Sequence, residues 1–131
     1  MLQNDIENYL KEVKNAILSD RFIISRNKNR PENERLFMEY ILNESRVKEI
    51  LLNLTVQNFS EVRPNEHPGY EDEKLYIFGT DVKLLERFGT GERIVSLYIK
   101  FNKLETRFVI VISFHEHKYP LTYPFRRFHH S

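Results

Sequence analysis

The chain has 131 residues, of which 40% are hydrophobic and 30% are charged, and its formal net charge is +1. This size and balance predict one domain with a core of its own, and the weak positive charge permits contact with nucleic acid without requiring it. Because cysteine is absent, disulfide bonds, a cysteine nucleophile and cysteine-ligated zinc are excluded.

The first 55 residues are predicted to be mostly helical. Helices are expected over 4–19, 31–42 and 45–54, with a strand over 21–25 and a loop over 26–31. Apolar residues recur at spacings of three and four in these helices, as in helices that bury one face. We expect Asn4 and Ser45 to cap the first and third helices, and Pro31 to occupy the first turn of the second.

The rest of the chain is predicted to be loops and strands. A loop is expected over 57–70, because two prolines and a glycine interrupt that segment. Strands are expected over 75–78, 81–88, 94–102 and 107–114, with a turn at 89–91 and a tail from Tyr119. Gly79 is expected to end the first strand. Helices followed by a meander of strands over 74–115 predict an α+β fold, in which the N-terminal helices cover one face of an antiparallel sheet.

The last two strands each separate apolar from polar side chains with a period of two, which indicates half-buried strands. The side chains expected in the core are Val95, Leu97, Ile99 and Phe101 in the first strand, and Phe108, Ile110, Ile112 and Phe114 in the second. The side chains expected together on the open face include Tyr98, Lys100, Arg107, Ser113 and His115, with His117 beyond the strand end.

The register of this hairpin has two solutions. If Phe101 pairs with Phe108, His115 lies opposite Ile94, about 13 Å along the strand from the row of Tyr98. If the chain turns more tightly around Thr106 and Arg107, His115 lies directly opposite Tyr98. The alternation of faces is the same in both registers.

An open face of this composition suits the cleavage of RNA without a metal. Attack by a ribose 2′-hydroxyl on its own phosphate needs a general base, a general acid and cations. Histidine at position 115 could take either proton-transfer role. Lys100 and Arg107 could stabilise the developing charge, and Tyr98 could orient the phosphate. The ordinary alternative is a solvated polar face without chemistry.

A metal site is a weaker interpretation of the same strand. His115 and His117 are expected to point the same way, as a pair of ligands would, while Glu116 points to the other side. A third ligand is missing at a useful spacing, and His-Glu-His does not match the helical spacing of zinc proteases.

The two hairpin strands also resemble a known family. Val95-Ser-Leu-Tyr-Ile-Lys-Phe101 and Val109-Ile-Val-Ile-Ser-Phe-His115 look like the C-terminal half of MqsR toxins, which belong to toxin–antitoxin systems. The segment Val47–Phe59 is similar to a helix of that family and the phenylalanine that follows it. The resemblance covers residues 45–117.

The resemblance implies a RelE-like α+β fold, cleavage of mRNA without metal, and neutralisation by a cognate antitoxin. The active-site tyrosine of the family falls on Tyr98, and its C-terminal active-site lysine falls on His115. A second family lysine has no counterpart here, and Arg63 is the nearest cation. The family's glutamine meets the apolar run 75–78.

We therefore expect residues 1–131 to form a single MqsR-like toxin domain that cleaves mRNA and binds an antitoxin, with no cofactor, metal, membrane or direct DNA partner. A cytoplasmic location is expected, since the sequence shows neither a signal peptide nor an apolar run near the roughly 18 residues of a membrane span. The candidate catalytic residues are Tyr98, Lys100 and His115; the candidate RNA-binding residues are Arg63, Arg107, His117, Arg126 and Arg127. The alternative is a non-enzymatic module that holds a protein partner.

Overall fold

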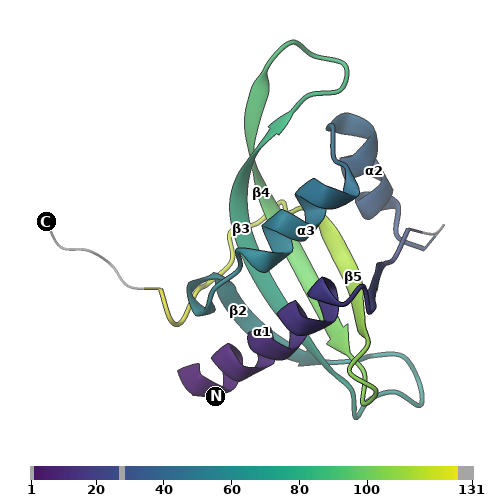
Figure 1. The fold of residues 1–131 in the computed structure, drawn as a ribbon, viewed down its shortest axis with the longest axis vertical. Coiled ribbons are helices and arrows are strands. Elements are labelled where there is room, and N and C mark those ends of the chain that lie inside the picture. The colour runs from purple at the N-terminus through teal and green to yellow at the C-terminus, as the bar shows by residue number, and fades with distance from the viewer. Residues whose placement is uncertain (1, 27–28, 127–131) are drawn as a thin grey trace, which may run out of the picture.

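A computed structural model describes residues 2–26 and 29–126 and has the α+β architecture that the sequence predicts (Figure 1). The helices in this part of the chain are α1 (Gln3–Leu18), α2 (Pro31–Glu39) and α3 (Glu44–Leu52), followed by a 3₁₀ turn, η1 (Val56–Asn58). The strands are β1 (Phe22–Ile24), β2 (Phe59–Pro64), β3 (Lys74–Leu85), β4 (Glu92–Lys103) and β5 (Val109–Glu116). No helix within the described ranges is long and apolar enough to cross a membrane.

The five strands form one sheet in the order β1-β5-β4-β3-β2. β1 runs parallel to β5, and the remaining neighbours are antiparallel. Helices α1 and α3 cross one face of this sheet, while the C-terminal tail passes behind it (Figure 1). In the part of the chain that the structure describes, no helix covers the opposite face, and we call it the open face.

Helix α1 supplies one side of the core. Its apolar positions pack against the sheet and are buried, namely Ile6, Leu10, Val13 and Ile17. The first turn is closed by the Asp5 carboxylate, which accepts a hydrogen bond of 3.0 Å from the backbone N–H of Leu2. The expected cap, Asn4, lies inside the helix. Asn4 is the second residue of the helix, two positions after the N-cap residue Leu2.

The ends of α2 and α3 also differ from the predictions. Asn43 caps α3 in place of Ser45, because its side-chain oxygen accepts a hydrogen bond of 2.8 Å from the backbone N–H of Arg46. Helix α2 stops at Glu39 because Tyr40 leaves the helix and forms a β-bridge with Glu86, near the tip of the β3–β4 hairpin. Tertiary pairing therefore shortens a helix whose own sequence could continue.

Gly79 does not end a strand, and β3 runs through it without a break. The reason for a glycine here is space on the open face. A Cβ at this position would lie 2.2 Å from the Tyr123 hydroxyl and 2.7 Å from Leu121 Cδ1, both in the tail. Gly79 therefore permits the tail to pack directly on the backbone of β3.

The expected loop 57–70 contains strand β2, which the sequence prediction missed. The loop was predicted because of Pro64 and Pro68. Pro64 is the last residue of β2, and β2 is an edge strand of the sheet. A proline is tolerated there because its missing N–H leaves no central ladder bond unmade.

A bulge in β5 changes which side chains face the core. Lys100 pairs with Ser113, but the next residue of β4, Phe101, pairs with Val111, so Ile112 is the extra residue. Val109 and Val111 are fully buried in the core as a result. The prediction that Ile110 and Ile112 face the core is therefore wrong, whereas the prediction for Phe114 is confirmed.

The bulge is held by a side chain from α2. Buried Asn33 donates to the carbonyl of Ile112 at 2.9 Å and to that of Ser25 at 2.7 Å. Its side-chain oxygen accepts from the backbone N–H of Phe114 at 2.8 Å. These bonds satisfy polar groups that the bulge would otherwise leave unpaired.

Candidate functional site

The bulge selects the second of the two hairpin registers. Tyr98 of β4 pairs directly with His115 of β5. Their rings stack with centroids 5.2 Å apart and an interplanar angle of 16°. The hairpin closes at Arg107, which has a φ of 67°. The tyrosine and the histidine are thus adjacent on the open face.

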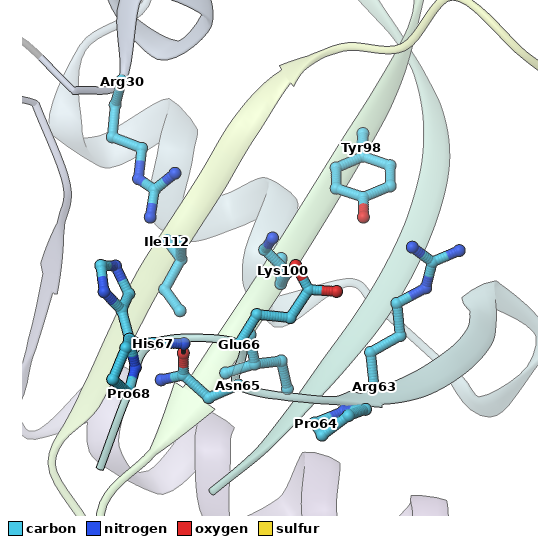
Figure 2. A pocket seen from close by; sticks show the side chains of 11 residues that line it. Arg30, Arg63, Pro64, Asn65, Glu66, His67, Pro68, Tyr98, Lys100 and Ile112 are labelled. Atoms are coloured by element: carbon cyan, nitrogen blue, oxygen red, sulfur yellow. Dashed lines mark hydrogen bonds between the residues drawn. The ribbon is translucent and has the colours of Figure 1, made fainter. Parts of the chain in front are cut away.

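Beside this ring pair, the open face carries a pocket with a volume of about 360 Å³. Its lining includes three cationic side chains, Arg30, Arg63 and Lys100, together with Tyr98, and Figure 2 shows Arg30 and Arg63 on opposite sides of Lys100. Glu66 and His67 also line it, from the loop between β2 and β3. We call this the cationic pocket.

Three separate elements bring the cations together. Lys100 stands in the middle of β4, and Arg63 comes from β2, two strands away. Arg30 immediately precedes the first residue of α2. Arg63 also forms an ion pair of 2.8 Å with Glu61 on its own strand. The three cations are therefore far apart in the sequence and come together only when the chain folds.

The loop that bears Glu66 and His67 is anchored at its base. Asn65 is bonded to Glu73 through its backbone N–H at 2.9 Å and through its side chain at 3.0 Å. The Glu73 carboxylate in turn accepts a bond of 3.2 Å from Asn102 of β4. This network fixes the start of the loop over the open face, so Glu66 and His67 are held at the pocket.

Half-buried Lys100 has a perturbed acidity. Desolvation lowers its pKa, the neighbouring charges of Arg30 and Arg63 lower it further, and Glu66 acts in the opposite direction. Burial also raises the pKa of Tyr98, partly offset by Arg63. The tyrosine therefore keeps its proton at neutral pH, while the lysine gives up its proton more readily than an exposed lysine.

The tautomer of His115 follows from a hydrogen bond of its ring to the backbone. Nδ1 lies 3.0 Å from the backbone carbonyl oxygen of Glu116. A carbonyl oxygen can only accept, so Nδ1 carries the proton and Nε2 of a neutral ring is free to accept one. His115 is not among the residues that line the cationic pocket. It lies beside Tyr98, as its direct partner on the neighbouring strand.

Two predicted residues lie away from this pocket. Arg107 sits in the β4–β5 turn near Glu12 of α1, whose pKa is lowered chiefly by the hydrogen bond from Lys103 and in small part by the charge of Arg107. Arg107 is therefore not on the open face near Tyr98. The left-handed turn at Arg107 breaks the alternation on which that prediction depended. His117 lines a separate hollow against α2, and its Nδ1 contacts the carbonyl of Tyr119.

The structure describes one of the two tail arginines that were predicted to bind RNA. The Arg126 guanidinium stacks on the ring of Tyr123 at 3.9 Å, and Tyr123 lies over Gly79 of β3. Arg126 is therefore on the open face but outside the lining of the cationic pocket. Arg127 lies outside the described residues.

The metal alternative gains no support from the side-chain arrangement. Across residues 2–26 and 29–126, no group of three or more His, Cys, Asp or Glu side chains is placed to hold an ion. His115 and His117 each bond to a nearby backbone carbonyl.

The sequence interpretation missed Arg30, Glu66 and His67. All three lie outside the strands, so strand alternation carries no information about them. The only signal was compositional, because Arg30 lies in a basic segment and Glu66 begins an acidic one. Comparisons of the chain with protein-family models, with curated proteins and with solved structures found no match.

Proposed function

We propose that this chain is an endoribonuclease that needs no metal and cleaves RNA by attack of a 2′-hydroxyl on the adjacent phosphate. The observation that carries the proposal is the cationic pocket beside a stacked tyrosine–histidine pair. Lys100 lies between Arg30 and Arg63 in this pocket, and cations so placed suit a phosphodiester whose negative charge grows in the transition state.

The candidate groups divide the chemistry among them. His115 accepts the proton of the 2′-hydroxyl at Nε2, the nitrogen that its hydrogen bond leaves free. Tyr98, which stays protonated, donates a hydrogen bond that orients the phosphate. Lys100 and Arg63 stabilise the charge on the phosphate oxygens, and the lowered pKa of Lys100 suits it to protonate the departing 5′-oxygen.

A role as the toxin of a toxin–antitoxin pair rests on the resemblance to the MqsR family, including the RelE-like fold. The pairing of Tyr98 with His115 is the register that places the two matched family positions side by side, which supports this part of the proposal. A cognate antitoxin would then be the protein partner.

The proposal is tested by incubating the purified chain with single-stranded RNA in the presence of a chelator. We expect cleavage products that end in 2′,3′-cyclic phosphate, and loss of both cleavage and growth arrest in His115→Ala. Arg107→Ala is the matched control, because that cation lies in the hairpin turn away from the pocket. RNA left intact across many sequences would favour a non-enzymatic binding module, and loss of activity with chelator would favour a metal enzyme.

A further inference from the structure

Lys100 combines two properties that an ordinary phosphate-binding lysine does not need. Its amine lines a recessed pocket, and it is flanked by the guanidinium groups of Arg30 and Arg63. The same two cations and the burial of the side chain lower its pKa. A larger fraction of this amine is therefore neutral, and a neutral amine is a nucleophile.

The rest of the pocket indicates what such an amine would meet. Arg30 and Arg63 offer forked donors that match a phosphate group. The volume of about 360 Å³ is at the small end of the range for small-molecule sites. A ligand with a phosphate at one end would thus hold its other end near the Lys100 amine.

We propose that the cationic pocket binds a phosphorylated aldehyde and joins it to Lys100 as an imine. The neutral Nζ forms a bond to the carbonyl carbon as the second bond of the C=O group breaks, and one of the two amine protons is transferred to the oxygen to give a carbinolamine. Loss of a proton from nitrogen and of the hydroxyl as water then leaves the C=N bond. No electron acceptor or donor is required.

Two neighbours assist or oppose this reaction. Tyr98 keeps its hydroxyl protonated, so it can hydrogen-bond to the oxygen that departs as water. Glu66 faces the same pocket and places a negative charge near Lys100. That charge repels a phosphate and favours the protonated amine, so Glu66→Gln should increase imine formation.

The inference is tested with pyridoxal 5′-phosphate, followed by borohydride reduction of the imine to a stable secondary amine and mass spectrometry of the peptides. We expect Lys100 to be modified before the other lysines. Arg63→Ala should lower its modification about tenfold, the factor expected for one lost hydrogen bond to a charged group. Excess inorganic phosphate should compete, and pyridoxal without phosphate should react poorly.

Exposed Lys74, at the first residue of β3, provides the matched control. Lys74→Arg should leave modification of Lys100 unchanged, whereas Lys100→Arg should remove it without changing modification elsewhere. Modification spread evenly over the lysines, or equal reaction with pyridoxal, would overturn the inference. Since phosphate competition uses the unaltered chain, a variant that fails to fold does not prevent this test.

The inference uses the phosphate contacts of the proposed nuclease but does not depend on RNA cleavage. A chain that cleaves RNA and shows no selective modification at Lys100 would refute the imine alone. Selective modification in a chain that leaves RNA intact would refute the nuclease alone.

Discussion

The same strands build both faces of the sheet, but one face forms the apolar core and the other carries the cationic pocket. On the face under the helices, Phe78, Phe101 and Phe114 are 0% exposed and close the core. On the open face, Lys100 is half buried between other cations at a cost to its charged form. The covered face is arranged for stability, whereas the open face keeps an unfavourable cation cluster, which is typical of functional sites.

The largest effect is expected in the core. Phe101 and Lys100 are neighbours in β4 but belong to opposite faces. Phe101→Ala should lower the free energy of unfolding by about 3–5 kcal/mol, through lost apolar burial and the cavity left behind. Urea denaturation followed by circular dichroism measures this loss. A loss as large in Lys100→Met would show that the two faces do not differ as described.

A substitution at Asn33 tests the bulge in β5, which determines which side chains of that strand face the core. Asn33→Leu should cost about 2–3 kcal/mol, because the Ile112 carbonyl and the Phe114 N–H would lose their buried partner. The same change at Asn8, exposed on α1, is the control and should alter stability little. Unfolding curves that do not distinguish the two variants would contradict the role given to Asn33.

A substitution at Gly79 tests whether the tail packs on the open face through this position. Gly79→Val should cost about 1–2 kcal/mol and displace the tail, since Tyr123 and Leu121 occupy the space of a new side chain. Limited proteolysis after residue 118 reports the displacement. Gly91, where an added Cβ meets nothing within 4 Å, should accept the same change with no effect on tail cleavage.

The smallest stability effect is expected at Lys100, with the opposite sign. At pH 7 the unfolded chain holds this proton more tightly than the folded chain, because the folded pKa lies below the ordinary value of 10.5. Lys100→Met should therefore raise the midpoint of urea unfolding slightly. The gain should shrink as the pH rises through the lowered pKa of the folded state and vanish above 10.5, because the wild-type lysine is then neutral in both states.

Much of the fold follows from local patterns in the sequence. The spacing of Ile6, Leu10 and Val13 predicts α1, and the alternation around Tyr98 and Lys100 correctly places both on the open face. These patterns succeed because each depends on residues a few positions apart. The prediction at Gly79 failed, because the glycine is needed where the tail, about 40 residues later in the chain, packs on β3.

The parts that failed depend on distant contacts. The bulge at Ile112 is stabilised by Asn33, which is 79 residues away, and it reverses the faces of the residues before it. Arg30 and His67 reach the pocket from loops, whose positions no periodicity predicts. Strand alternation thus placed Tyr98 and Lys100 on the open face, and it failed for Arg107, which lies in a turn.

We propose that the cationic pocket on the open face carries out RNA cleavage. The most direct measurement compares the cleavage rate of one RNA, with chelator present, for the wild type, Lys100→Met and Arg107→Ala. We expect Lys100→Met to fold at least as stably as the wild type and to lose cleavage about 100-fold or more, while Arg107→Ala cleaves normally. Cleavage by Lys100→Met at the wild-type rate would contradict it.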